Sequence, residues 1–346
     1  SAPRSRCTVV WLACLYRELR RQSMEGETSY SLPSALSFLL WPLLLSLPLY
    51  LTTNDKYATV FPSEWYDATA PSASQTEWPS PLGLSLGIMA VVVGQIFTLL
   101  YHWLHVRAFV FGTVVSVQRS GAEAHDFWRE CIGHLSQPEG FVLLGAYLTG
   151  TWMFRLMPRS YYAFEGGVDW VAVAVQLVLQ DTIQFGMHLL EHKVDDLLGS
   201  RKWFYRRSHK PHHRFTNPKL FDAFNGSGPD TFCMILVPLL VTANLVHTNV
   251  WSYMAFGSLY ANGLCLIHSE CDHPWDGLFR SLGVATAGDH HVHHTLFTWN
   301  YGHLFTYADR VCQTYKSPSE VSKFHAFGSA AQFPAGGQGR EIPKAS

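Results

Sequence analysis

Long apolar stretches with few charged residues alternate with polar segments along the chain. A helix rises about 1.5 Å per residue, so crossing about 30 Å of hydrocarbon takes roughly 20 apolar residues. Four stretches reach or approach that length: 32–51, 82–104, 141–157 and 168–190. Between them they contain only three charged residues, Arg155, Asp169 and Asp181. Each stretch predicts a helix.

A fifth stretch, 231–267, has 37 residues without an acid or a base and is too long for one crossing. Pro238 and the polar sequence His247-Thr248-Asn249 predict two shorter helices joined by a tight turn. A single apolar run is often the buried helix of a soluble protein. Five such runs favour an all-α, polytopic membrane helical bundle.

Basic residues in the loops predict the orientation of this bundle, because cytosolic loops are enriched in Lys and Arg. The segment 1–31 has five arginines, and 193–219 has eight basic residues against two acids. The segment 52–81 has one lysine and four acids. We therefore place the first two segments in the cytosol. The segment 105–139 is then cytosolic and amphipathic, and the hairpin 231–267 returns to the cytosol at His268.

Composition narrows the functional classes. The 346 residues carry a net charge of −1 with 48% hydrophobic and 15% charged residues. Disordered chains are less apolar, and nucleic-acid-binding proteins carry a basic excess. The seven cysteines form no CxxC pair, so we expect reduced thiols. We expect N-terminal passes with a connecting segment in 1–139, a histidine-rich domain in 140–320 and a disordered tail in 321–346.

The 18 histidines are concentrated in three motifs on the predicted cytosolic face. These are HxxxH, HxxHH and HxxHH, formed by His188 and His192; His209, His212 and His213; and His290, His293 and His294. Residues three and four apart share a helix face, so each motif can offer convergent imidazoles, although Pro211 disfavours a regular helix through the second. With His268 at the end of the hairpin, they predict a cytosolic histidine-rich helical cap.

Other histidines are weaker candidates for metal binding. His273 is a possible ligand, and His291 lies off the shared face of its motif and is expected to be a hydrogen-bonding neighbour. The remaining seven are expected to be interfacial, surface or packing residues: His102, His105, His125, His134, His247, His303 and His325. Asp181 and Gln184 lie one to two turns below His188 and are candidates to line the inner end of a substrate path. The alternative for Asp181 is a buried acid that is hydrogen-bonded to a neighbouring helix.

Neutral imidazole binds iron, copper and zinc, and a set of nine fits two metal ions better than one. HLLEH also matches the H-x-x-E-H pattern of zinc hydrolases, with Glu191 as the base, but that reading leaves six histidines unexplained. A transporter would place its ionisable groups near the bilayer midplane rather than at helix ends. The motifs therefore favour a two-metal centre.

The three motifs, in this order and at these positions, resemble the fatty acid hydroxylase/sterol desaturase superfamily over residues 140–320. The resemblance implies an endoplasmic-reticulum membrane oxidase with two iron ions. Such enzymes use O₂, with electrons from cytochrome b5 and its NAD(P)H reductase, to desaturate or hydroxylate a lipid. It also implies that the nine motif histidines, counting His268, are the iron ligands.

Within this superfamily the sequence is most similar to C-5 sterol desaturases. The resemblance rests on the HKPHH form of 209–213, on 299–302 and on Asp309-Arg310, and 4-methylsterol oxidases share much of this pattern. Two departures weaken the assignment of a sterol substrate. Ala308 replaces the expected tryptophan, and 220–229 lacks the expected histidines. The alternatives are a fatty-acyl, sphingoid or ether-lipid hydroxylase and a non-catalytic metal-binding membrane protein. No fused cytochrome b5 signature is present, so a separate electron donor is expected.

Overall fold

The computed structural model describes residue 36 and residues 81–106, 115–118, 127–137, 147–148, 150–151, 156–162, 166–199 and 203–321. These residues are helical and contain no β-strand apart from two isolated bridges, Ser116–Cys271 and Val284–Phe305. The all-α prediction is therefore confirmed for the described residues. The predicted tail beyond 321, most of the predicted helices 32–51 and 141–157, and most of the 105–139 connection lie outside them.

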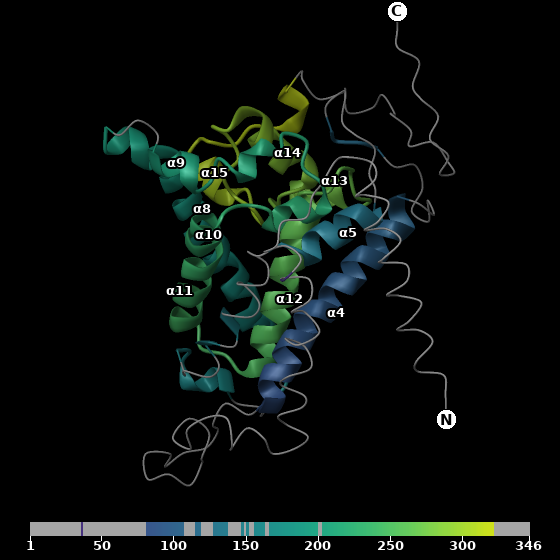
Figure 1. Cartoon of the computed structure of the whole chain (residues 1–346), viewed down its shortest axis with the longest axis vertical. Helices are drawn as coiled ribbons and strands as arrows, with labels where there is room; N and C mark the ends of the chain where they lie inside the picture. Colours follow the sequence, from purple (N-terminus) through teal and green to yellow (C-terminus); the bar gives the residue numbers. More distant parts are fainter. Residues whose placement is uncertain are drawn as a thin grey trace, which may run out of the picture.

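Four long helical segments run side by side along the molecule (Figure 1). They are α4 (Pro81–Val106), α8 (Trp170–Leu197), α12 (Val250–Ile267) and a continuous segment made of α10 (Gly228–Thr231), the π-helical turn η6 (Phe232–Leu236) and α11 (Val237–Leu245). Helix α12 packs against α4 and α8, and α11 packs against α8. These segments form the bundle that carries the histidines at one end.

Shorter elements gather at the end of the bundle where α8 and α12 finish (Figure 1). They are α9 (Trp203–Arg207), η4 (His212–Arg214), η5 (Leu220–Phe224), α13 (Asp276–Ser281), α14 (Ala287–Leu296), α15 (Tyr307–Val311) and η7 (Pro318–Glu320). Helix α5 (Phe127–Leu135) packs against η5, and η3 (Arg159–Tyr162) packs against α12. This cap contains the second and third histidine motifs.

The sequence predicted three helical regions that the structure describes. The stretch 82–104 is α4, 168–190 lies in α8, and 231–267 forms two helices with the turn 246–249 between them. Among the described residues, Gly228–Leu245 is the one helix long and apolar enough to cross a membrane. The helix hairpin is confirmed.

Local sequence explains where these helices begin. Asp169 caps α8, because its carboxylate accepts hydrogen bonds from the N–H groups of Val171 and Ala172, both at 3.0 Å. Asn249 caps α12 by accepting from Ser252 N–H at 2.9 Å. The polar turn that interrupts the apolar run is therefore the signal that starts the second helix of the hairpin.

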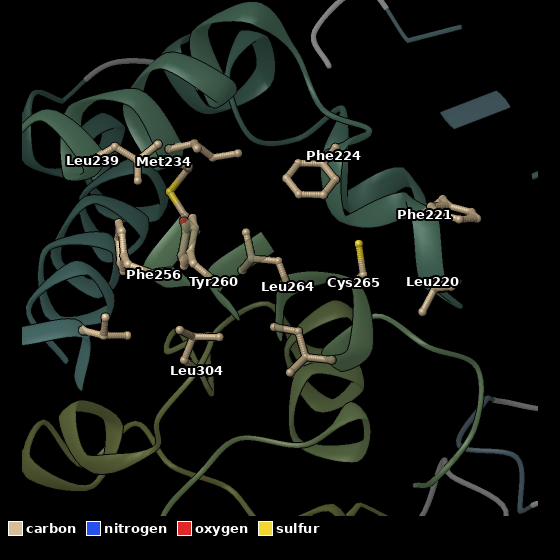
Figure 2. Packing of buried hydrophobic residues seen from close by; sticks show 13 residues of the cluster. Leu220, Phe221, Phe224, Met234, Leu239, Phe256, Tyr260, Leu264, Cys265 and Leu304 are labelled. Atoms are coloured by element: carbon tan, nitrogen blue, oxygen red, sulfur yellow. The ribbon is translucent and has the colours of Figure 1, made fainter. Parts of the chain in front are cut away.

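Apolar and amide side chains divide the interior of the bundle. Phe256, Tyr260 and Leu264 of α12 pack with residues of η5 and of the 228–245 segment in one buried cluster (Figure 2). Beside it, α8 buries glutamines at every fourth position, 176, 180 and 184, in line with His188. The Gln184 amide oxygen accepts from Tyr260 O–H at 2.8 Å, and that of Gln180 from Thr242 at 3.1 Å. These bonds fix the rotation of α8 and hence the direction of its histidines.

Candidate metal centre

The nine motif histidines, which come from four segments of the chain, form two groups at the end of the bundle. Within each group, one ligand atom per residue lies within 4.8 Å of all the others. Group one contains His188, His192, His209, His213 and His293. Group two contains His212, His268, His290 and His294. The nine residues that the sequence singled out are therefore together in space.

Two of the three motifs divide between the groups, which differs from the simple convergence expected of each motif. In α14, His290 and His294 belong to group two, whereas His293 belongs to group one. Successive helical residues are rotated by about 100°, so His293 and His294 diverge by a quarter turn. In the second motif, His212 belongs to group two and its neighbours His209 and His213 to group one. The divided motifs hold the two groups side by side.

The Nε2 atoms within each group are separated by distances close to, or slightly below, those expected around a metal ion. In group one they lie 2.8 Å apart between His188 and His209, and 3.1 Å apart between His213 and His293. In group two the pair His268–His290 is at 2.9 Å. Nitrogens bound to one transition metal at about 2.1 Å lie about 3.0–3.4 Å apart for right or tetrahedral angles. The geometry fits one ion per group.

The opposite ring nitrogens show which atoms face the two groups. Nδ1 donates to a backbone carbonyl at 2.7 Å in His188, His268 and His293, with Tyr301, Leu264 and Trp299 as acceptors. Nδ1 of His209 donates to the Asp230 carboxylate, also at 2.7 Å. In each neutral imidazole the Nε2 lone pair then points into the group. Two lone pairs at 2.8 Å repel unless a cation lies beside them, and such Nδ1 bonds are usual for metal-binding histidines.

Burial lowers the pKa of several of these rings. Eight of the nine are buried, while His192 is partly exposed. Burial lowers the pKa of His212 to about 4, and burial together with neighbouring imidazoles holds the pKa of His213, His290 and His294 well below the ordinary value. These four imidazoles are therefore uncharged near neutral pH and available to a metal.

Two acids lie behind group one. Asp230, at the start of the 228–245 segment, holds His209, and Glu191 Oε2 lies 3.6 Å from the same Nδ1. Glu191 thus faces the outer side of the His209 ring and not the Nε2 side where a metal would bind. This position does not suit a hydrolytic base, which must reach a metal-bound water. Asp230 lies outside the histidine motifs and was not predicted from the sequence, although the capping Ser227 three residues earlier marks the start of its helix.

The segment after α14 is shaped by two buried acids. Asp309 accepts from the N–H groups of Tyr301 at 2.8 Å and Gly302 at 2.7 Å. A Cβ atom at position 302 would lie 2.9 Å from Asp309 Oδ2, so glycine is needed there. Ala308, where tryptophan was expected, is buried against Phe185 and Tyr301. This packing presents the Tyr301 carbonyl to His188.

Asp181 is the second acid, and the structure places it in a structural position. Its carboxylate is fully buried and accepts from the N–H groups of His303, Leu304 and Phe305 at 3.0, 2.7 and 3.2 Å. Of the two roles considered from the sequence, the buried hydrogen-bonded acid is correct, and its partner is a loop. Gln184 is likewise used by Tyr260.

The remaining histidines have various surroundings. His273 lies outside both groups and bonds Tyr101 at 2.7 Å and Ser269 at 2.9 Å. Two histidines of α4, His102 and His105, are buried and bond the Glu270 carboxylate and the Asp272 carbonyl. The His134 ring stacks on Phe221, and His247 is exposed. His291, which was expected to be a hydrogen-bonding neighbour, bonds the Ala287 carbonyl. His125 and His325 lie outside the described residues.

His303 is the exception that sequence analysis missed. It was expected to be an isolated surface or packing residue, but it is 4% exposed and lies between the two groups. Its ring centroid is 5.0 Å from that of His188 and 5.1 Å from that of His290. A single histidine outside any spaced motif carries no sequence signal, and only the folding of the 299–306 loop back onto α8 brings it here.

Two cavities lie beside the cap. An apolar one of about 230 Å³ is lined by Leu259, Ile267, Phe279, Ala287 and Leu304, among others. Leu259 and Phe279 are exposed, whereas Ile267 and Leu304 directly adjoin His268 and His303 in the chain. A more polar cavity of about 220 Å³ is lined by His192, Tyr205 and Tyr301, among others, and explains the partial exposure of His192.

Comparisons with known proteins agree with this site. The fatty acid hydroxylase family model matches residues 173–314. An alternative squalene epoxidase of Phaeodactylum tricornutum is 53% identical over 287 residues, 81% of this chain and 79% of its own length.

More distant relatives match a smaller part of the chain. A cholesterol 25-hydroxylase-like protein of Danio rerio is 31% identical over 47% of this chain and 62% of its own length. A Delta(7)-sterol-C5(6)-desaturase of Nicotiana tabacum is 27% identical over 49% and 64%. No solved structure matches significantly. The chain belongs to the fatty acid hydroxylase/sterol desaturase superfamily.

Proposed function

We propose that this protein is a membrane-bound di-iron oxygenase that epoxidises squalene or a closely similar isoprenoid olefin. The main support for this proposal is the 53% identity to a protein named as an alternative squalene epoxidase, over about four-fifths of both chains. The match to the fatty acid hydroxylase family model spans residues 173–314, which contain the three histidine motifs. Sterol enzymes match less than half of the chain.

The nine motif histidines would hold the two iron ions, one in each group. Bound iron supplies the electrons and the Lewis acidity that activate O₂. The protein would supply nine imidazole donors, of which His188, His268 and His293 are oriented by backbone carbonyl groups and His209 by Asp230. Because both groups consist of histidines alone, these imidazoles would leave the positive charge of bound ions largely uncompensated.

The apolar cavity supports a hydrocarbon substrate. Its lining is mostly aliphatic and aromatic, its outer side carries Leu259 and Phe279, and its inner side adjoins His268 and His303 in the chain. We propose that the olefin enters here from the bilayer and displaces little water, because few polar groups line the path. Gly263 widens this cavity, since a Cβ atom there would lie 2.6 Å from Leu304 Cδ2.

The proposal also covers the membrane topology, the cellular location and the electron donors of the protein. The apolar helix Gly228–Leu245 and the exposed apolar side chains of α4, α8 and α11 support several membrane crossings, with the cap in the cytosol. We propose the endoplasmic reticulum as the location and cytochrome b5 with its reductase as the electron donors. The polar cavity at His192 is the part of the described surface where a soluble donor comes nearest to group one.

The test is turnover of purified full-length protein in lipid nanodiscs with Fe²⁺, NAD(P)H, cytochrome b5, its reductase and squalene. One atom of O₂ should enter the squalene double bond as an epoxide, and the other should leave as water with two electrons and two protons. Mass spectrometry after incubation under ¹⁸O₂ should show one labelled oxygen per product. His212→Ala and His293→Ala, one from each group, should abolish the product.

The control variant is His247→Ala, which changes an exposed imidazole far from either group in the sequence. It should retain full turnover. The sterol alternative is favoured by the relatives that act on sterols, and a Δ7-sterol in the same assay tests it. Oxidation of the sterol with unchanged squalene would replace the epoxidase proposal. Two bound irons without oxidation of either lipid would indicate a different substrate or a non-catalytic protein.

A further inference from the structure

His303 is a tenth imidazole at the metal centre, outside the three motifs. Its ring lies 5.0 Å from His188 of group one and 5.1 Å from His290 of group two, centroid to centroid. Rings within a single group are spaced similarly, for example 5.1 Å between His188 and His192 and 5.4 Å between His268 and His294. His303 is therefore as near to both groups as their own members are to one another.

The backbone around His303 is held in place by hydrogen bonds to the buried carboxylates of Asp181 and Asp309. Asp181 accepts the N–H groups of His303 and Leu304, and the charge of a buried carboxylate strengthens such bonds. On the other side, Gly302 N–H is bound by Asp309 at 2.7 Å. Two buried carboxylates thus fix the residues on both sides of the His303 Cα, which positions the side chain between the groups.

The His303 ring is short of hydrogen-bond partners. Among the described residues, its buried Nδ1 has none. A buried polar atom left unsatisfied costs about 1–3 kcal/mol, and folded proteins contain few of them. Burial lowers the pKa of His303 to about 3, so the ring is neutral and carries a lone pair. A neutral, buried, under-bonded imidazole beside other imidazoles has the properties of a metal ligand.

We propose that His303 binds the metal of group two and completes a set of five imidazoles there. Group one already contains five histidines and group two only four, so a fifth ligand in group two gives both ions the same donor number. Rotation of the His303 side chain brings one ring nitrogen to the ion, while Asp181 and Asp309 keep the backbone in place. The inference rests on the proposed metal centre.

Metal binding, measured without turnover, tests this proposal. Full-length protein in nanodiscs is stripped of metal and titrated anaerobically with Fe²⁺ against a competing chelator, with bound iron counted by mass spectrometry. The wild type should bind two ions per chain. His303→Gln and His303→Ala should keep the first ion and bind the second at least tenfold more weakly. Co²⁺-loaded variants should show an altered visible spectrum, because the spectrum reports the ligands.

The matched control is His134→Gln, which changes a largely enclosed imidazole that stacks on Phe221 and belongs to neither group. It should bind both ions as the wild type does. Unchanged affinity for both ions and an unchanged Co²⁺ spectrum in the His303 variants would overturn the proposal. Binding of fewer than two ions by the wild type would instead overturn the proposed di-iron centre. Circular dichroism of each metal-free variant tests whether it is folded. If His303→Ala does not fold, the His303→Gln variant alone tests the proposal.

Discussion

Asp181→Asn should uncouple the 303–305 loop from α8, because the buried Asp181 carboxylate binds three consecutive backbone N–H groups. Oδ1 accepts from His303 and Leu304, and Oδ2 accepts from Phe305. Asparagine retains one carbonyl oxygen but replaces the other with an NH₂ group. If the retained oxygen keeps the first two bonds, a donor faces the Phe305 N–H.

The size of the effect follows from the bonds that change. One buried N–H loses its acceptor, which costs about 1–3 kcal/mol, and two bonds lose their charge assistance, about half of 1.5–3 kcal/mol for each bond. We expect a total loss of roughly 2.5–6 kcal/mol. With about 2–4 °C per kcal/mol for a domain of this size, the thermal midpoint should fall by about 5–24 °C. Asp181→Ala should cost more, because all three N–H groups lose their partner.

Thermal unfolding of metal-free and metal-loaded protein in one detergent, followed by circular dichroism, measures this effect. The control is Asp169→Asn, the same substitution at the exposed start of the same helix, where asparagine caps as well as aspartate does. Its midpoint should change by little. Equal midpoints for the two variants would refute the assignment of Asp181 as the anchor of this loop.

Three further predictions concern the site and its surroundings. Asp230→Ala removes the acceptor of His209 Nδ1 and should weaken metal binding by about 10–100-fold in an anaerobic titration, whereas unchanged affinity would contradict the role of this bond. Leu259→Trp should raise KM for squalene by narrowing the apolar cavity. The control Leu240→Trp, at an exposed site on α11, should leave KM unchanged. Equal KM values for these two variants would exclude entry of squalene at Leu259. The metal-free protein should lose stability as pH falls from about 6.5 to about 4, because in this range His212 takes up a proton in the unfolded chain but not in the folded one. The loss in the free energy of unfolding is up to about 1.4 kcal/mol per pH unit for this group. Unfolding midpoints that rise with acid would contradict this prediction.

The sequence determined the helices and the donors. Apolar runs of about 20 residues specify helices through local periodicity and length. The turn of the hairpin at Asn249 can be recognised from the sequence alone. The spacing of the three motifs predicted eight imidazole donors, and the position of His268 at the end of the hairpin added the ninth. These features are local, because they depend on residues within one or two helical turns of each other.

Only the tertiary structure decided how the donors are shared and supported. The division of 209–213 and 290–294 between two groups depends on how α14 and η4 are rotated against α8 and α12. Asp181, Asp230 and His303 acquire their roles through partners 21 to about 120 positions away. A hydrogen bond or a ring contact at such separation leaves no periodic trace in the sequence, because it is set by the packing of whole helices and not by the residues beside it.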